Sequence, residues 1–404
     1  MNENYLQFIW KVKRIPFHLI KTTTNQAITI KNVGIHNTHE SGPDFTNGRI
    51  LLNGIEWAGN IEIHIKSSDW NKHNHHHDSA YENVILHVVL HHDMEILVNG
   101  SPIPTIELKD HIDREHFENW QYFADSSQEI NCRKSLSSVE SVYLESMMER
   151  ALWDRLNRKT FFLKQVREVS DPKEMLYFLF ARAFGVKVNQ LPFEELTQRL
   201  PLSIIKSVEK NKQGELILAT SGFEPVLDFK ESSRIWVKLN RTHEIGRVAC
   251  LSWKRKGLRP QSHPGIRLKQ FATLIENYDF EIALKHLETD LFIDYTLKVL
   301  DEHLKGEYQK LTISESFKNL IIINAIVPFI WWYAEEMEND ELKSKAISVL
   351  ESTKAESNTI IKTWKLLGVK VKNGYQSQAL IELYNEHCMK NKCLSCEIGV
   401  QLLK

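Results

Sequence analysis

Residues 61–66 carry three polar side chains that can do chemistry, in the alternating sequence Ile-Glu-Ile-His-Ile-Lys. On a β-strand successive side chains point to opposite faces, so Glu62, His64 and Lys66 share one face while the isoleucines enter a core. Upstream, Asp44 follows a Gly-Pro turn and opens another strand-like run. If the two runs pair, two carboxylates and a basic group meet on one surface. The alternative is a half-exposed strand whose polar face is solvated.

Two carboxylates beside a basic group are what a metal-dependent phosphodiesterase needs. Hard divalent ions such as Mg²⁺ or Mn²⁺ take carboxylate oxygens and keep waters and phosphate oxygens as further ligands. We therefore expect Asp44 and Glu62 to hold Mg²⁺ or Mn²⁺. His64 or Lys66 would orient the attacking water or stabilise the developing charge.

The same spacing resembles the PD-(D/E)XK nuclease superfamily, in which a Pro-Asp pair precedes an acidic-X-Lys motif on a sheet that follows a helix. The resemblance covers roughly residues 3–108. It implies that Asp44 and Glu62 bind metal and that Glu3, in the preceding helix, offers a further acid. His64 stands where the pattern has lysine, and a neutral imidazole supplies no permanent charge. Lys66, two positions on, is the substitute on the same face.

Histidines concentrate near the amino terminus, with 11 of the 18 in the first 100 residues. Imidazole suits zinc, iron or nickel, so a transition-metal site is a second reading, with a zinc-dependent small-molecule hydrolase as its function. His75 or His77 can converge with His87 if the intervening segment folds back on its strand. The zinc-hydrolase spacing His-Glu-X-X-His does not occur in the sequence. The alternatives are a polar loop and, for His87, a hydrogen-bonded core histidine. The remaining members of the cluster are His73, His76, His91 and His92.

A local basic segment lies between Glu244 and Glu276, where seven Lys and Arg residues occur and no acidic one. The net charge of −1 gives no global field to attract nucleic acid, so a polyanion must bind such a local patch. The segment leads to a predicted helix N-terminus near Gly265, whose dipole also favours phosphate. A solvated basic loop is the alternative. The predicted nucleic-acid contacts are Lys254, Arg255, Lys256, Arg259 and Arg267.

Three cysteines close the chain as Cys388-X4-Cys393-X2-Cys396. The C-X2-C spacing is typical of tetrahedral metal sites, and a third cysteine five residues upstream makes chance less probable. The arrangement is similar to the iron–sulfur loop of endonuclease-III-like DNA glycosylases, which uses four cysteines. We expect zinc or an iron–sulfur cluster, with ordinary buried thiols as the alternative. The candidates for a fourth ligand are His387, Cys132, Cys250 and an exogenous group, although Cys132 is expected to be packed rather than reactive.

Two regions of different character must position these residues. Residues 1–130 carry a helix-like segment at 3–12 and strand-like runs, whereas helical periodicity dominates beyond residue 137. We expect an α+β fold: a restriction-endonuclease-like mixed-sheet domain over 1–130, followed by a larger all-α domain over 138–404 with a Cys-rich loop at its end. The predicted strands are 27–33, 49–52, 61–66, 84–90, 95–98 and 103–108, and the second belongs to a strand-like run over 45–52.

Composition and hydropathy indicate a globular protein without a membrane span. Hydrophobic residues make up 42% and charged residues 25%, which excludes a disordered or fibrous chain. The most apolar stretch, residues 320–334, is shorter than the roughly 20 residues of a membrane span and predicts a buried helix. With five cysteines and no apolar leader at the amino terminus, a cytoplasmic location is expected and no membrane partner.

Several stretches resemble a bacterial family called domain of unknown function 2851, which implies no established activity. They are GPDFTNGRI, WAGNIEIHIKSSDW, HNHHHDSAYENVILHVV, EMLYFLFARAFGVKVNQLPFEEL, GLRPQSHPGIRLKQFA and CMKNKCLSCEIG. From the residues, we expect a metal-dependent nuclease-like protein acting on DNA or RNA. The alternative is a non-catalytic nucleic-acid-binding or scaffold protein.

Overall fold

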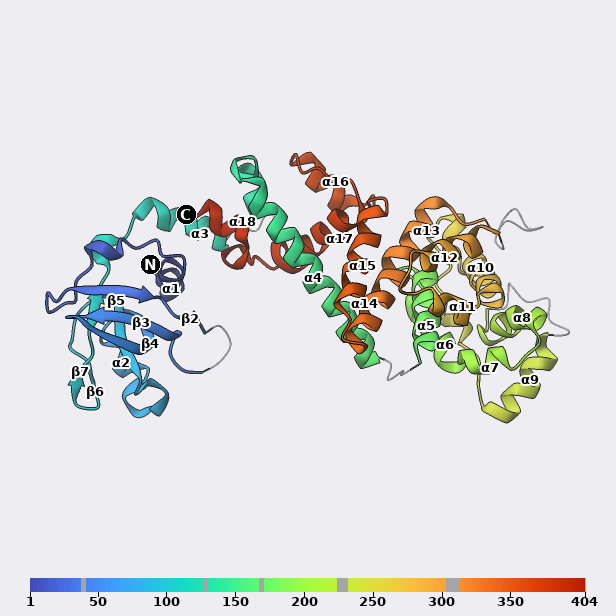
Figure 1. The fold of residues 1–404 in the computed structure, drawn as a ribbon, viewed down its shortest axis with the longest axis horizontal. Coiled ribbons are helices and arrows are strands. Elements are labelled where there is room, and N and C mark those ends of the chain that lie inside the picture. Colours follow the sequence, from blue (N-terminus) through green and yellow to red (C-terminus); the bar gives the residue numbers. More distant parts are fainter. Residues whose placement is uncertain (38–40, 126–129, 167–170, 224–231, 303–311, 404) are drawn as a thin grey trace. The chain divides into compact units, whose positions relative to one another are not determined.

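The computed structural model describes residues 1–37, 41–125, 130–166, 171–223, 232–302 and 312–403 (Figure 1). An N-terminal mixed sheet is followed by a mostly helical region, so the α+β expectation is confirmed. The chain divides into two compact units. A sheet unit comprises residues 1–147 and 383–404, and a helical unit comprises residues 148–382.

The sheet has the strand order β1-β3-β4-β5-β8, and β2 pairs with β3. β3 is antiparallel to β1 and β4, whereas β4, β5 and β8 run parallel. The turn between β3 and β4 is Asn53–Gly54, and both residues have positive φ, 49° and 83°. This is the two-residue hairpin that an Asn-Gly dipeptide predicts. The strands are β1 (Ile28–Asn32), β2 (Ile35–His36), β3 (Phe45–Leu52), β4 (Ile55–Lys66), β5 (Val84–His91) and β8 (Thr105–Glu107). A separate hairpin joins β6 (Leu97–Val98) and β7 (Ser101–Pro102).

The main hydrophobic core lies between one face of the sheet and helix α1 (Glu3–Lys11). Ile61 and Ile63 of β4 enter this core together with Leu6, Ile9 and Trp10 of the helix. The alternation of residues 61–66 therefore sets the faces of β4 as predicted. The side chain of Asn2 caps the helix by accepting a hydrogen bond from the Tyr5 N–H.

The opposite face of the sheet is covered as well. Helix α2 (Asp69–Lys72) and the 3₁₀ turns η2 (His75–His77) and η3 (Ser79–Tyr81) connect β4 to β5, and a second apolar cluster contains Trp70 and Tyr81. Because of this cover, Glu62 is only 4% exposed and His64 only 1%. The solvated polar face, the alternative reading of the strand, does not occur at these two positions.

The carboxyl-terminal residues join the sheet unit, whereas the sequence suggests a helical domain running from 138 to 404. Leu403 is buried in the core of the sheet unit, and its carbonyl contacts the His116 ring of helix α3 (Arg114–Asp125). Figure 1 shows α18 (Glu397–Leu402) near α3. Burial of this tail is a tertiary contact that local periodicity does not encode.

The remaining helices form the helical unit, which α4 enters from the sheet unit. These helices lie beyond residue 137, where the sequence predicts mostly helical structure. The helices are α4 (Ser141–Val166), α5 (Pro172–Gly185), α6 (Gln190–Arg199), α7 (Leu202–Lys206), α8 (Lys210–Thr220), α9 (Ser232–His243), α10 (Pro264–Asn277), α11 (Phe280–Lys285), α12 (Leu291–Glu302), α13 (Glu315–Ile321), α14 (Val327–Glu336), α15 (Asp340–Ser352), α16 (Thr359–Leu366) and α17 (Gly374–Glu382).

The most apolar segment of the chain is a core helix. Helices α13 and α14, joined by a π-helical turn over Ile322–Ile326, make one continuous run over Glu315–Glu336 that is long and apolar enough to cross a membrane. However, 78% of its most apolar window is buried inside the protein, as in the core helix of a soluble protein. The prediction of a buried helix is confirmed.

Candidate metal centre on the sheet

Strand pairing brings the two predicted carboxylates together. Phe45 pairs with Ile61 in the antiparallel ladder, so Asp44, one residue earlier, lies beside Glu62. The main-chain N–H of Asp44 donates to Glu62 Oε2 at 2.9 Å. In return, Asp44 Oδ2 accepts from the main-chain N–H of Ile63 at 3.0 Å. Each carboxylate is thus fixed by the backbone of the strand that carries the other.

Helix α1 adds two polar side chains to this pair. Gln7 Nε2 donates to Asp44 Oδ1 at 2.8 Å. Glu3, one turn earlier, hydrogen-bonds the backbone of Ile65 and interacts electrostatically with His73. Residues four apart on a helix face the same way, which explains why both reach the sheet. Glu3 is among the residues predicted from the sequence and Gln7 is not, although a polar pair on a mainly apolar helix indicates both.

Histidines complete the cluster around the carboxylates. The donor atoms of His64, His73 and His75 all lie within 4.8 Å of one another. His64 Nε2 lies 3.2 Å from His73 Nδ1, and His64 Nδ1 lies 2.9 Å from His87 Nε2. Glu62 Oε1 is 3.5 Å from His64 Nε2 and 3.3 Å from His75 Nε2. One point on the sheet is therefore surrounded by imidazoles and carboxylates.

Aromatic side chains wall the cluster. The His75 ring stacks on Tyr81 with centroids 3.8 Å apart, and Trp70 packs edge-on against His64, His75 and His87. Trp70 is fully buried. Such walls exclude water and lower the local dielectric constant, which strengthens every electrostatic interaction within the site.

Burial controls the protonation of the carboxyl groups. Burial, followed by the charge of Glu62, raises the pKa of Asp44 to about 7. Burial raises the pKa of Glu62 to about 8, against the hydrogen bond from the Asp44 backbone, which lowers it. Two adjacent buried carboxyl groups without a counter-ion therefore hold protons near neutral pH. A divalent cation would ionise both.

The imidazoles are kept neutral by the same environment. Burial, then the neighbouring imidazole of His87, lowers the pKa of His64 to about 2. Burial lowers the pKa of His87 to about 3, and burial also lowers the pKa of His75. Neutral imidazole is the form that binds metal. The buried Nε2 of His75 has no hydrogen-bond partner among the described residues, as a donor atom reserved for a ligand would.

This donor set fits a first-row transition ion better than magnesium. Magnesium takes oxygen ligands, whereas imidazole suits zinc and iron and carboxylate suits manganese. The site expected for Mg²⁺ or Mn²⁺ consisted of Asp44 and Glu62 alone. The structure adds three imidazoles to it, which favours Mn²⁺, Fe²⁺ or Zn²⁺.

Other residues of the sequence prediction lie away from the cluster. Lys66 is exposed at the end of β4, so His64, and not Lys66, is the basic side chain beside Glu62. His77 is exposed, and of the two histidines proposed to converge with His87, it is His75 that joins the cluster. His76 and His91 are also exposed.

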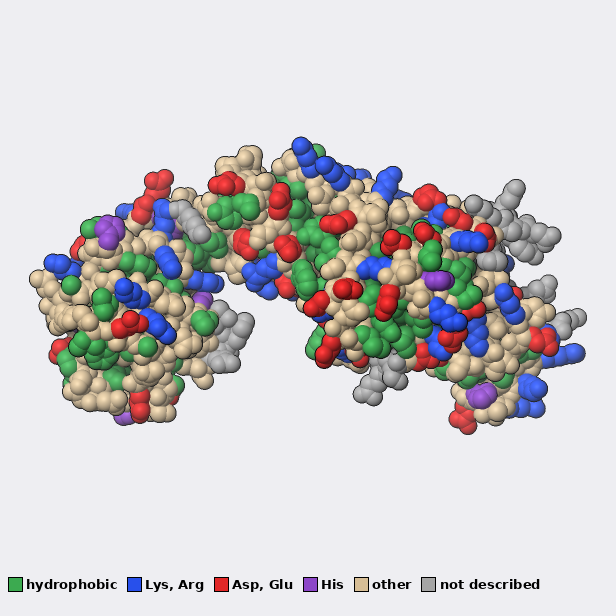
Figure 2. Space-filling model, viewed as in Figure 1, with side chains coloured by type: hydrophobic (Ala, Val, Ile, Leu, Met, Phe, Trp, Pro, Cys, Tyr) green, Lys and Arg blue, Asp and Glu red, His purple; other side chains and the backbone are tan. Residues whose placement is uncertain are grey.

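The basic segment of the helical unit is mostly exposed, with one exception. Lys254, Arg255, Lys256 and Arg259 are exposed. Arg267 is only 7% exposed, because it lies on the buried face of α10, where its guanidinium sits 3.3 Å from the centre of the Phe317 ring and donates to Gln270 Oε1. Arg267 therefore differs from the surface cations predicted with it. Figure 2 shows blue and red side chains intermixed over the visible face, in keeping with the balanced net charge.

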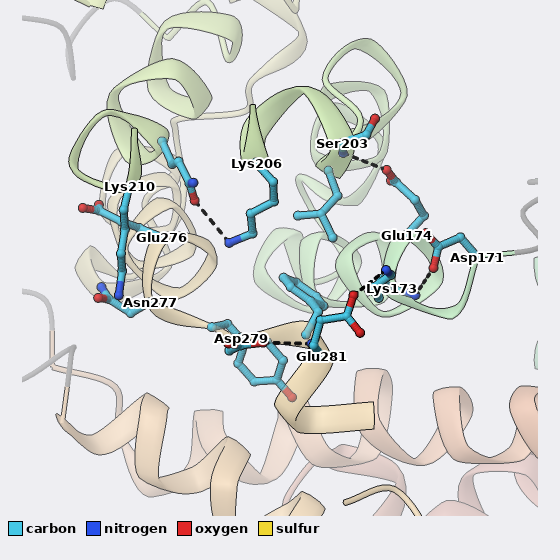
Figure 3. Close-up of a pocket in the computed structure, with 14 residues that line it drawn as sticks. Asp171, Lys173, Glu174, Ser203, Lys206, Lys210, Glu276, Asn277, Asp279 and Glu281 are labelled. Carbon is cyan, nitrogen blue, oxygen red and sulfur yellow. Dashed lines mark hydrogen bonds and ion pairs between the residues drawn. The ribbon is translucent and has the colours of Figure 1, made fainter. Parts of the chain in front are cut away.

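A polar pocket of about 440 Å³ lies elsewhere in the helical unit, between α5, α7 and α11 (Figure 3). Lys173 pairs with Glu281 at 2.7 Å, and Lys206 Nζ donates to Gln213 Oε1 and to the Ile275 carbonyl. Two of the lysines in this pocket are thus already paired with neighbouring acceptors.

Comparison with known proteins identifies the family and nothing finer. The family model described as Protein of unknown function (DUF2851) matches residues 3–359. No curated protein and no solved structure matches the chain. The terminal stretch with three cysteines, quoted above for its resemblance, lies beyond the matched residues. Since the match covers most of the chain and every residue of the cluster on the sheet, the protein belongs to the family of proteins of unknown function DUF2851.

Proposed function

We propose that the protein is a cytoplasmic, divalent-metal-dependent phosphodiesterase that acts on nucleic acid. The observation that carries the proposal is the convergence of Asp44 and Glu62 with His64, His73 and His75 on one face of the sheet. Burial shifts the pKa of these carboxyl groups upward and that of His64 downward. Groups with pKa values perturbed in this way cluster at functional sites.

The residues divide into ligands and supports. Asp44, Glu62 and His64 come from the sheet and would hold the cation, with His73 as a further ligand. Gln7 and His87 orient Asp44 and His64 through the hydrogen bonds described above. A bound divalent ion lowers the pKa of a water ligand and polarises a phosphoryl oxygen.

His75 is placed to receive the proton of the attacking water. Its ring is partly exposed, and its Nε2, which has no hydrogen-bond partner in the described part of the chain, lies 3.3 Å from Glu62 Oε1. Burial lowers its pKa, so the ring is neutral and can accept a proton at neutral pH.

Nucleic acid is the substrate class that the helical unit favours. Arg259, the buried Arg267 and Lys354 line a cleft of about 910 Å³ together with Ser314 and Ser316, and Glu315 and Glu356 line it as well. Guanidinium and hydroxyl groups are common phosphate contacts. The exposed basic residues Lys254, Arg255 and Lys256 precede Arg259 in the sequence.

The test is cleavage of labelled single- and double-stranded DNA and RNA with Mg²⁺, Mn²⁺ or Zn²⁺. We expect Mn²⁺ to support cleavage by the parent protein, and Asp44→Asn and Glu62→Gln to abolish it. The matched control is Glu56→Gln, which changes an exposed carboxylate on the same strand that pairs with Arg49. A parent protein that cuts nothing, or acidic variants that cut as well as the control, would remove the catalytic proposal and leave a nucleic-acid-binding protein.

A second candidate is a zinc-dependent hydrolase of small molecules, favoured by the three-imidazole donor set. The two candidates differ in substrate and in retention of metal. A zinc enzyme would keep its ion through purification and hydrolyse small esters without cutting nucleic acid.

A further inference from the structure

Two segments that are far apart in sequence bring four cysteines into the sheet unit. Cys132 lies in the 3₁₀ turn η5 (Asn131–Lys134). The other three lie at the end of the π-helical turn η12 (Leu383–Cys388), in η13 (Cys393–Ser395), and directly before α18. All four are free cysteines. They are Cys132, Cys388, Cys393 and Cys396.

The two segments meet at these cysteines. Main-chain hydrogen bonds close the terminal segment into turns, from the Asn391 N–H to the Cys388 carbonyl at 3.1 Å and from the Cys396 N–H to the Cys393 carbonyl at 3.2 Å. Cys132 and Cys393 pack against the same hydrophobic core. The two segments touch directly, because the Asn131 side chain donates to the sulfur of Cys393 at 3.5 Å.

The loop that carries Cys393 and Cys396 is tightly closed, and main-chain N–H groups in it point at a cysteine sulfur. The sulfur of Cys396 accepts hydrogen bonds from the main-chain N–H groups of Ile398 and Gly399. A Cβ at Gly399 would lie 2.2 Å from the carbonyl oxygen of Cys393, so only glycine lets the chain close this tightly. N–H groups aimed at sulfur stabilise the thiolate form over the thiol.

We propose that Cys132, Cys388, Cys393 and Cys396 bind one metal centre, either a zinc ion or an iron–sulfur cluster, through four thiolates. The C-X2-C spacing provides two ligands on one loop, and Cys132 supplies the fourth ligand that the carboxyl-terminal segment lacks. Cys250 is not assigned to this centre, since its sulfur already contacts Arg255. The proposal is independent of the proposed function of the site on the sheet.

Metal is bound by the thiolate and not by the thiol. Each cysteine that ligates the centre would therefore exchange its S–H bond for a sulfur–metal bond and release its proton to solvent.

The centre would fasten the carboxyl-terminal segment to the sheet unit. Cys132 and Cys393 pack against the main core, in which Leu403 is buried. A four-thiolate link between residue 132 and the tail closes a long loop of chain, which lowers the entropy of the unfolded state. Removal of the metal should therefore loosen the tail and lower the melting temperature.

The first test measures zinc, iron and acid-labile sulfide in the full-length protein purified without oxygen. We expect close to one zinc ion per chain and no colour, or iron with sulfide and a broad visible absorption. Cys132→Ser should lose the metal, while the matched control Cys250→Ser and the variant His387→Ala should keep it. Metal-free parent protein, or Cys132→Ser with its full metal content, would overturn the proposal.

The second test uses the unmutated chain, so it does not depend on a variant that folds. A thiol reagent should modify one cysteine rapidly in the native protein, Cys250, and all five only after a chelator and mild denaturant remove the metal. Five equally reactive thiols before chelation would contradict a four-thiolate centre.

Discussion

The Nδ1 atom of His64 lies 2.9 Å from the Nε2 atom of His87, so imidazoles from two neighbouring parallel strands form one hydrogen-bonded pair. Both rings are buried. If His64 Nε2 binds a cation, its proton must sit on Nδ1 and be donated to His87. Metal-binding histidines are regularly held in this way by a second hydrogen bond. His87 is thus a positioning residue.

Replacing His87 by Ala should weaken metal binding by about 10–100-fold, the usual cost of losing such a support. His87→Gln should recover part of the loss, because its amide oxygen can accept the same hydrogen bond. Mn²⁺ affinity measured by calorimetry checks the prediction. Urea unfolding of each variant separates a binding effect from a loss of stability, and an unchanged affinity in a folded His87→Ala protein would contradict the role.

Asp44→Asn should stabilise the metal-free protein at pH 8 and not at pH 4. The folded-state pKa of Asp44 lies near 7, above the ordinary 3.8, so the folded state holds this proton more tightly than the unfolded state does. The stability from this group is fully present below about pH 4 and is lost as the pH rises through 7. Asparagine does not titrate, so its advantage over the parent should reach roughly 1 kcal/mol or more at pH 8, since one pKa unit is worth about 1.4 kcal/mol.

Urea unfolding in a chelator at pH 4, 6 and 8 measures this difference. Saturating Mn²⁺ should reverse the order at pH 8, because the cation replaces the proton between Asp44 and Glu62. If the difference in unfolding free energy between Asp44→Asn and the parent is the same at all three pH values, the pKa of Asp44 is not raised in the folded state.

Much of the sheet, but less of the site, could be predicted from the sequence. The alternation of residues 61–66 and the Asn53–Gly54 turn are local signals, and together they imply that Asp44 and Glu62 meet. The positions of His73 and His75 depend on short turns. Such turns have no periodic hydrophobic pattern from which their structure could be predicted. Cys132 is separated from the carboxyl-terminal cysteines by the whole helical unit in sequence, so only tertiary packing brings the two segments together.

The combined change of Lys254, Arg255 and Arg259 to Ala should weaken nucleic-acid binding and flatten its salt dependence. Each lost phosphate contact lowers the slope of log affinity against log salt by about 0.9 for duplex DNA. These side chains are exposed, so stability should change little. The slope is measured by fluorescence anisotropy at several salt concentrations, and an unchanged slope would exclude the segment from the interface.

Arg267→Ala is a contrasting variant in the same segment. Its guanidinium is buried against Phe317 and Gln270, so the change should destabilise the helical unit by about 1–3 kcal/mol. Thermal unfolding would show this loss, whereas an unchanged melting temperature would mean that Arg267 is not held as described.

His75→Ala and His76→Ala test whether imidazoles belong to the metal site. The two residues are adjacent in η2, yet His75 lies against Glu62 and Tyr81 while His76 is exposed. Loss of a residue that only hydrogen-bonds a metal ligand usually lowers activity by roughly 10–100-fold. We expect His75→Ala to lower metal-dependent cleavage by more than this, and His76→Ala to leave cleavage unchanged. Nitrogen couplings in the electron spin resonance of bound Mn²⁺ should persist in both variants if His75 receives the proton, as proposed. Weaker couplings in His75→Ala would instead make His75 a ligand, and equal activity of the two variants would remove His75 from the site.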